Sequence, residues 1–283
     1  MSDRRAHLAR VEAHLTEVQV LAVALVAVPI TMLAEEVVSR RKGEARGPVG
    51  WRRSNLACGL LRLATAIPSA AVVTAVYTLV HRVSMPLHLV GGLGAVSLGL
   101  LGFLAYDFLW YWSHRASHRH PLLWATHAVH HQAERYDMSL NLRLGMLTAL
   151  TQLPFDLPLA LLGVPPTVFL AIKAIHAASL FWLHSKHLGD LGPLGFIFNT
   201  PSFHRVHHSR DEAHHHVNFG GVLIVFDRLF GTFVPEPATR LRYGVEGFEE
   251  RSALKANLVP LVAWWLRRRA RSVRGKLTSQ LRA

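Results

Sequence analysis

The sequence predicts an all-α integral membrane helical bundle of about four to five spans, with a cytosolic histidine-lined di-metal site. Three observations lead to this fold class. Of the 283 residues, 51% are hydrophobic and only 17% are charged, and the mean hydropathy is positive at +0.23. The apolar residues gather in long uncharged segments, and most histidines gather in three short clusters. A soluble basic protein of this size would carry more charge.

Four segments are candidates for membrane helices. Val18–Ala34, Leu63–Val80 and Val83–Tyr106 contain no Asp, Glu, Lys or Arg, and each is near the roughly 20 apolar residues that a helix needs to cross a bilayer. Leu144–Leu183 is mostly apolar and is interrupted at residues 163–166, which predicts a helical hairpin with a proline pair at its tip. Buried helices of a soluble all-α protein are the alternative.

Basic residues are distributed unevenly around these segments. Residues 40–53 contain six Lys or Arg, and another basic run occupies residues 267–276. By the positive-inside rule, the first loop, the segment after Tyr106 and the C-terminus lie in the cytoplasm. With five crossings, the N-terminus lies outside. We expect a multi-pass protein of a bacterial inner membrane or an endoplasmic-reticulum-like membrane, whose site faces the cytoplasm and whose basic tail contacts anionic lipid. This distribution of the +13 net charge argues against nucleic acid as a partner.

Fifteen of the 19 histidines lie between residues 114 and 216. The three clusters follow the patterns H-x-x-x-H, H-x-x-H-H and H-x-x-H-H, and their members are His114, His118, His127, His130, His131, His204, His207 and His208. Residues three and four apart share a helix face, so each cluster directs its imidazoles one way. Eight imidazoles are enough to bind two metal ions. Imidazole suits iron, zinc and copper alike, so the ligand type leaves the metal open. The single cysteine, Cys58, excludes a thiolate metal site.

Several flanking residues are candidates to support or extend this ligand set. Asp107 lies on the stripe of His114 and His118 and is expected to accept a ring N–H from a ligand histidine. Glu134 shares the face of the second cluster on a continued helix, and it is a candidate to support or bind a metal or is simply a solvated surface residue. Asn218 is a further supporting candidate. His184 ends an apolar helix and is a candidate metal ligand. Residues 199–202 predict a helix start before the third cluster.

Other histidines are less strongly indicated as ligands. They are His176, His187 and the run at residues 214–216, for which a solvated loop or a substrate-entry segment is the commoner explanation.

These motifs resemble those of the fatty acid hydroxylase/sterol desaturase superfamily, most closely its alkylglycerol monooxygenase-like branch. The resemblance rests on Asp107–His118, Leu123–His131, the Phe181–His184 segment, Asn199–His208 and Asn218–Phe233, and extends over roughly residues 18–265. Three departures concern substrate and extra ligands. Phe203 stands where this branch usually has a histidine, His187 is an addition, and residues 214–216 replace a Tyr-x-Asp-like segment.

The resemblance implies one domain over residues 1–283 with a catalytic core at about 95–235. It also implies a membrane-bound non-haem di-iron oxidoreductase that uses O2 to hydroxylate, desaturate or cleave a lipid, sterol, fatty-acyl or alkyl chain. Electrons must come from an unidentified reductase or electron-transfer protein, because the sequence has no dinucleotide motif, flavin motif or cysteine cluster.

Two other classes are alternatives. A membrane zinc hydrolase of the zincin type needs His-Glu-x-x-His, but Arg115 and Ser117 stand between the first two clustered histidines. A metal transporter or sensor would place polar ligands within its spans, whereas these clusters lie beyond them.

Overall fold

The computed structural model describes residues 29–44, 49–85, 89–90, 92–247 and 252–280, and within these ranges the protein is a helical bundle without strands. The all-α prediction is confirmed. The elements are a helix over residues 29–41, α2 (Val49–Val83), α3 (Ala95–Arg119), α4 (Pro121–His131), η2 (Met138–Leu142), α5 (Thr148–Leu162), α6 (Pro166–Leu180), η3 (Phe181–His184), η4 (Gly192–Phe196), α7 (Pro201–His207), η5 (Glu212–His214), α8 (Val225–Leu229) and α9 (Ala253–Gln280).

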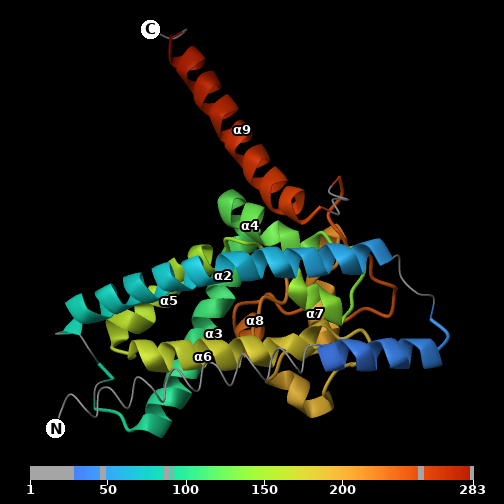
Figure 1. Cartoon of the computed structure of the whole chain (residues 1–283), viewed down its shortest axis with the longest axis horizontal. Coiled ribbons are helices and arrows are strands. Elements are labelled where there is room, and N and C mark those ends of the chain that lie inside the picture. The colour runs from blue at the N-terminus through green and yellow to red at the C-terminus, as the bar shows by residue number, and fades with distance from the viewer. Residues whose placement is uncertain (1–28, 45–48, 86–88, 91, 248–251, 281–283) are drawn as a thin grey trace.

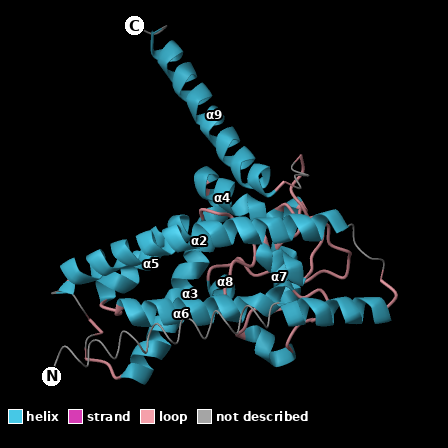
Figure 2. Cartoon of the chain, in the orientation of Figure 1, coloured by secondary structure: helices cyan, strands magenta, loops and turns pink. Residues whose placement is uncertain are grey.

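The long helices form one body, and α9 projects from it. Helices α2, α5 and α6 run along the long axis, and α3 crosses them (Figure 1). The loops collect around α7 and α8 (Figure 2). The histidine clusters belong to this loop-rich side of the bundle, so long helices support a site built from short elements.

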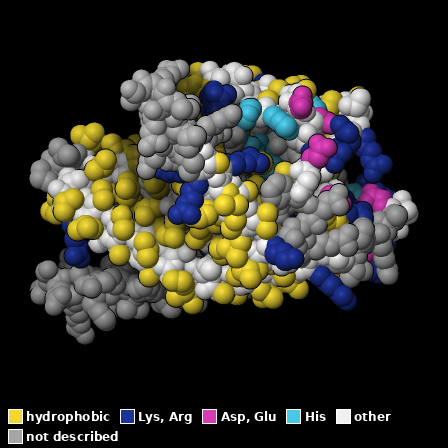
Figure 3. Space-filling view, turned by 90° about the horizontal axis from the view of Figure 1, so that it is seen from above, with side chains coloured by type: hydrophobic (Ala, Val, Ile, Leu, Met, Phe, Trp, Pro, Cys, Tyr) yellow, Lys and Arg dark blue, Asp and Glu magenta, His cyan; other side chains and the backbone are white. Residues whose placement is uncertain are grey.

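Three described helices are long and apolar enough to cross a membrane: Gly50–Val83, Ala95–Arg119 and Pro166–His184. Much of their apolar surface is exposed, including Ile67 (79%) and Val96 (75%), and Figure 3 shows a broad hydrophobic face. An apolar surface of this extent is unusual for a soluble monomer and typical of contact with lipid. The number of spans, four to five, stays a prediction, because residues 18–28 of the first expected span lie outside the described residues.

The span expected at Val83–Tyr106 begins too early. Helix α3 starts at Ala95 and continues to Arg119. The preceding segment contains Pro86 and three glycines in residues 91–94, which disfavour a continuous helix. The shift carries the helix past Tyr106, so Asp107 and the first histidine cluster lie on the same continuous helix as the apolar span.

The hairpin predicted within Leu144–Leu183 is confirmed. Helix α5 ends at Leu162, its C-cap Gly163 has a left-handed φ of 97°, and Pro166 occupies the first turn of α6. The hairpin packs on α2 and α3 through a buried aromatic core, in which the Tyr77 and Phe169 rings stack with centroids 4.0 Å apart. A Cβ on Gly102 would lie 2.8 Å from Ile172 Cδ1, so this glycine permits the close approach of α3 and α6.

Arg143 holds α4 against α2. Its side chain is fully buried and donates hydrogen bonds to Val129 O (2.9 Å), Ser54 Oγ (2.7 Å) and Gln132 Oε1 (2.9 Å). A buried guanidinium that is bonded in this way fixes the helix that carries the second histidine cluster.

Candidate metal centre

Four short or terminal elements bring nine histidines together. Helix α3 ends with His114 and His118, and α4 ends with His127, His130 and His131. His184 ends η3, and α7 with its C-cap supplies His204, His207 and His208. The predicted start of α7 is confirmed, because the Thr200 hydroxyl caps the helix by accepting from Phe203 N (3.3 Å).

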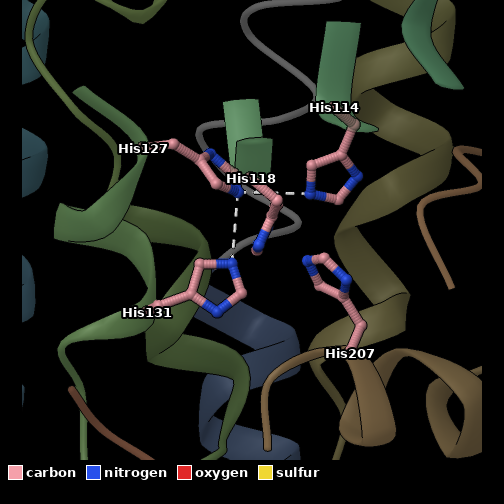
Figure 4. A group of neighbouring side chains, drawn as sticks. All are labelled: His114, His118, His127, His131 and His207. Carbon is pink, nitrogen blue, oxygen red and sulfur yellow. Dashed lines mark hydrogen bonds between the residues drawn. The ribbon is translucent and has the colours of Figure 1, made fainter. Parts of the chain in front are cut away.

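The nine side chains divide into two groups. The five-histidine group comprises His114, His118, His127, His131 and His207, and the four-histidine group comprises His130, His184, His204 and His208. Within each group, one nitrogen per ring lies within 4.8 Å of every other. Figure 4 shows the five rings directed at a common centre. His184 therefore joins the eight clustered histidines.

Nitrogen atoms crowd the middle of both groups. In the five-histidine group, His127 Nε2 lies 3.2 Å from His114 Nε2 and 3.1 Å from His131 Nε2. In the four-histidine group, His184 Nε2 lies 3.1 Å from His130 Nε2 and 3.2 Å from His204 Nε2.

Backbone carbonyls determine which nitrogen of several rings carries the proton. The Nδ1 atoms of His114, His130 and His207 lie 2.9 to 3.0 Å from the carbonyl oxygens of Phe219, Arg143 and Val217, respectively. A carbonyl only accepts, so each Nδ1 is the donor, and Nε2 of the neutral ring carries a lone pair. His207 Nε2 and His118 Nε2 are buried without a hydrogen-bond partner. Lone pairs that converge in this way repel unless a cation lies among them, so both groups fit a metal ion.

Burial keeps the rings in the form that binds metal. Desolvation lowers the pKa of His130 to about 4, and it lowers the pKa values of His127, His204 and His208 well below the ordinary value for histidine. These rings are therefore neutral near pH 7, as ligands must be.

Comparison with known proteins assigns the segment that contains this centre. Residues 99–232 match the family model for fatty acid hydroxylase. This segment, which holds all nine histidines of the centre, is similar to fatty acid hydroxylases. Alkylglycerol monooxygenase of Danio rerio is 44% identical over 145 residues, which are 51% of this chain and 32% of that protein. The Homo sapiens alkylglycerol monooxygenase is 43% identical over 134 residues, which are 47% and 30% of the two chains.

A bacterial relative matches this chain over a segment of similar length. The ornithine lipid hydroxylase OlsE of Rhizobium tropici is 37% identical over 139 residues, 49% of this chain and 42% of that protein. These comparisons confirm the resemblance to the alkylglycerol monooxygenase-like branch. The chain spans only about a third of the length of the alkylglycerol monooxygenases that it matches. No solved structure matches it.

Asp107 supports the centre differently from what the sequence suggested. Its carboxylate accepts hydrogen bonds from His176 Nε2 (2.6 Å), Val222 N (2.8 Å) and Leu223 N (2.9 Å). These donors are His176 and two loop N–H groups, and none is a histidine of either group. A direct role of Asp107 in activity stays a prediction. Asp107 instead fixes the loop just after Phe219, whose carbonyl oxygen orients His114.

Glu134 lies outside both histidine groups. Helix α4 ends at His131, with Gln132 as its C-cap, so Glu134 no longer shares the face of the second cluster. The Glu134 side chain is exposed in the following bend. The expectation of a shared face on a continued helix is wrong for this geometric reason, and a supporting role of Glu134 stays a prediction.

Asn218 connects the loops beside the five-histidine group by hydrogen bonds to their backbone. It is fully buried with a left-handed φ of 54°, and its Nδ2 donates to Phe203 O (2.9 Å) and Val234 O (2.7 Å). The residue immediately before it, Val217, provides the carbonyl oxygen for His207 Nδ1. Asn218 thus positions backbone near the centre, and its role in activity stays a prediction.

Two further supporting residues escaped the spacing argument. Asp227 accepts from Phe219 N (2.8 Å) and Gly220 N (2.6 Å), and burial raises its pKa to about 6. Asn199 donates to Gly220 O (2.7 Å). Asp227 follows its two donors by eight and seven residues, and Asn199 precedes Gly220 by 21 residues. Neither residue belongs to a histidine cluster, so the spacing of the clusters gives no signal for them.

The remaining histidines lie outside both groups. His176 bonds Asp107, and His187 Nε2 lies 2.9 Å from Ser39 Oγ. In the 214–216 run, His215 Nε2 hydrogen-bonds Arg210 O (3.1 Å).

Two cavities meet the histidine centre from different sides. A cavity of about 220 Å³ reaches five of the nine histidines and is walled by α3, α5 and α6. Its lining includes Trp110, Leu180, Phe181, Ser117 and Thr148. A polar cleft of about 690 Å³ reaches His118, His131, His207 and His208. In Figure 3, histidines are visible in this hollow between acidic and basic side chains. The centre can therefore be approached from the interior of the bundle and from its polar end.

Proposed function

We propose that the protein is a membrane-bound lipid hydroxylase that uses two iron ions and O2. The observation that carries the proposal is the pair of inward-facing histidine groups at the end of a cavity between apolar helices. The five-histidine group would hold one metal and the four-histidine group the other. The family match and the names of the relatives support oxygen insertion into a lipid.

The metals and the protein have separate tasks in this proposal. Iron bound in the two groups would supply activation of O2 for attack on an unactivated C–H bond. The chain binds and orients the lipid, excludes water and holds ring protons at the Nδ1 atoms of His114, His130 and His207. Electrons come from an external donor protein that reaches the centre by its polar end, next to the cleft.

The cavity favours a neutral lipid that carries hydroxyl groups. One part of its wall is apolar and includes Trp110, Leu180 and Phe181, which suits an alkyl chain. Another part carries hydroxyls that already donate to the backbone, as Ser117 does to Ser113 O (2.9 Å) and Thr148 does to Gly145 O (2.8 Å). Their oxygens can still accept. No Lys or Arg is among the described residues that line this cavity, so it offers no cation to a carboxylate or phosphate.

We therefore infer an alkylglycerol-like substrate, in which a hydroxyl-bearing end adjoins an alkyl chain. Several relatives are named for action on alkylglycerol, and one is named for an ornithine lipid. Hydroxyl donors match the acceptors on the cavity wall, whereas the charged groups of an ornithine lipid would meet no counter-charge there.

A zinc hydrolase and a metal transporter remain as competing functions, and one observation weighs against each. Neither histidine group contains a carboxylate among the described residues, so a general base of the zincin type has no candidate. Both groups lie at the helix ends and not in the middle of the apolar spans.

The test uses full-length protein that is reconstituted with iron and given isotopically labelled O2, a chemical reductant and either an alkylglycerol or a fatty acid of equal chain length. We expect labelled oxygen in the product from the alkylglycerol and little from the fatty acid. Loss of two hydrogens without label would identify desaturation instead. O2-independent hydrolysis, or no turnover with a full metal complement, would refute the proposal.

The orientation in the membrane is part of the proposal. We place the histidine centre and the C-terminus on the cytoplasmic side, on the strength of the basic residues around residues 40–53 and 267–276. A compartment-sensitive reporter fused after Ala283 should respond on the cytoplasmic side. A response only from the opposite compartment would reverse this topology.

A further inference from the structure

A second apolar groove lies away from the proposed substrate cavity, between α4 and α9. Its volume is about 380 Å³, and its walls include Pro121, Trp124 and Ala128 from α4 and Ala263 and Trp264 from α9. The Trp124 ring also packs 5.2 Å from the His118 ring, centroid to centroid. The groove is therefore separated from the histidine centre by one side chain.

Two arginines stand at the end of this groove. Arg267 and Arg268 both line it, and both are exposed. The Arg268 guanidinium lies 5.7 Å from the centre of the Trp264 ring, within cation–π distance. No acidic residue is found among the described residues that line the groove. An apolar groove that carries two cations and no acidic side chain among its described lining residues matches a ligand with an apolar chain and an anionic head.

Helix α9 is anchored to the body near its start. Ala256 is fully buried and accepts from Gln132 Nε2 (3.2 Å), and Asn257 Oδ1 accepts from Met146 N (2.8 Å). Beyond this point α9 projects from the bundle (Figure 1). The groove lies between α4 and the part of α9 that follows this anchor, because the α9 residues that line it come after Asn257.

The opposite face of α9 is also apolar. Leu258, Val262 and Trp265 are 38%, 53% and 45% exposed, and they recur at helical spacing. The apolar part, residues 254–266, is about 20 Å long at 1.5 Å per residue, which is short of a bilayer crossing. α9 is not one of the described helices that are long and apolar enough to span. Tryptophans followed by arginines are typical of a helix at the lipid headgroup level.

We propose that the groove between α4 and α9 binds one acyl chain of an anionic phospholipid, whose phosphate lies against Arg267 and Arg268. The planar guanidinium groups match phosphate geometry, and the apolar outer face of α9 places the groove at a membrane surface and not against a soluble ligand. Because α4 carries three histidines of the centre, the bound lipid packs against the helix that positions them. The binding does not depend on the proposed oxygenase activity and needs no metal.

The test compares phosphatidylglycerol with phosphatidylcholine bound to the purified full-length protein from an equimolar mixture, by native mass spectrometry. We expect enrichment of phosphatidylglycerol. The double variant R267Q/R268Q should reduce the enrichment at least about fivefold, since a basic residue near an anionic surface contributes about 1 kcal/mol. Both arginines are exposed, so this variant is expected to fold.

The matched control is R53Q/R269Q, which removes the same charge from exposed positions outside the groove. It should retain the enrichment. An Ala263→Trp variant fills the groove with both arginines intact and should also lose bound lipid. Equal losses in the two double variants would show diffuse attraction to charge, and retention in Ala263→Trp would show that the groove is not the site. Either result, or no enrichment in the unmodified protein, would overturn the proposal.

Discussion

The two histidine groups differ in what surrounds them. In the five-histidine group, His118, His131 and His207 line the polar cleft. In the four-histidine group only His208 does so, and the other three line the cavity between the apolar helices. All four members of the smaller group are buried, whereas His118 and His127 of the larger group are partly exposed.

This difference indicates separate tasks for two otherwise similar clusters. A metal with four histidine ligands keeps more exchangeable positions than one with five, and the four-histidine group is the one whose members lie mostly along the proposed substrate cavity. The five-histidine group has more contact with the cleft, where a soluble electron donor can approach. Access, more than ligand type, distinguishes the two positions.

The largest expected effect comes from unequal ligand loss. His184→Ala leaves three histidines in its group, whereas His118→Ala leaves four in the other. Iron-reconstituted protein should bind about two metals per chain. We expect His184→Ala to lose the metal of the four-histidine group, so that product formation is abolished. We expect His118→Ala to retain much more of the metal in the five-histidine group. Elemental analysis of the purified variants measures this.

His187→Ala is the control for that experiment, because His187 is close to His184 in sequence but contacts Ser39. It should keep two metals. Equal metal loss in His184→Ala and His118→Ala would remove the distinction between the groups. A stoichiometry near one in the unmodified protein after iron reconstitution would remove the paired site altogether.

A second, smaller effect should affect the five-histidine group alone. Asp107→Asn weakens the hold on Val222, Leu223 and His176 and so loosens the loop whose Phe219 carbonyl orients His114. We expect a loss of about 10–100-fold in activity or metal affinity, the usual range for residues that orient ligands. Metal titration should show weaker binding at one of the two positions. The exposed Asp190→Asn is the control, and weakening of the four-histidine group instead would contradict the argument.

The fold and most of the centre could be predicted because their signals are local. Uncharged runs predicted the helices, and Gly163 and the prolines predicted the hairpin tip. The spacing of three or four residues within clusters such as those of His118 and His131 predicted which rings share a helix face. The assignment of His184 depended on its position at a helix end, since no neighbouring histidine completes a motif with it.

Other features depend on where elements end and on contacts between distant segments. Glu134 appeared to continue a helical face, but α4 ends at His131 and turns it outward. Asp107 appeared close to the clustered histidines, yet loop N–H groups from more than 100 residues later occupy its carboxylate. Asp227 and Asn199 bond the backbone of that same loop. The division into groups of five and four likewise cuts across the second and third sequence clusters, so no single motif contains it.

A third effect concerns pH and the stability of the metal-free protein. Burial lowers the pKa of His130 to about 4, whereas an unfolded histidine has a pKa of about 6.5. As pH falls through this interval, the unfolded chain binds a proton that the folded chain does not, so the free energy of unfolding decreases. At pH 5 the loss from His130 alone is about 2 kcal/mol.

Thermal unfolding of metal-free protein at pH 7 and pH 5 measures this dependence. We expect a lower Tm at pH 5, and bound metal should raise the Tm at pH 7 because only the folded chain presents the complete site. His130→Gln should reduce the pH dependence. An equal or higher Tm at pH 5 in the unmodified metal-free protein would show that the buried rings are protonated in the fold.

The smallest effect should come from the densest run of histidines in the sequence. Residues 214–216 line the cleft but belong to neither group, and His215 is exposed and bonded to Arg210 O. Because an exposed ring with one backbone hydrogen bond contributes little, we expect His215→Ala to keep both metals and to change activity by no more than roughly twofold. His207→Ala, which removes a converging ring from the same cleft, is the comparison, and it should weaken one metal position. If His215→Ala were as inactive as His184→Ala, the metal centre would have to extend across the cleft, and the contrast between a buried group and a solvent-facing group would fail.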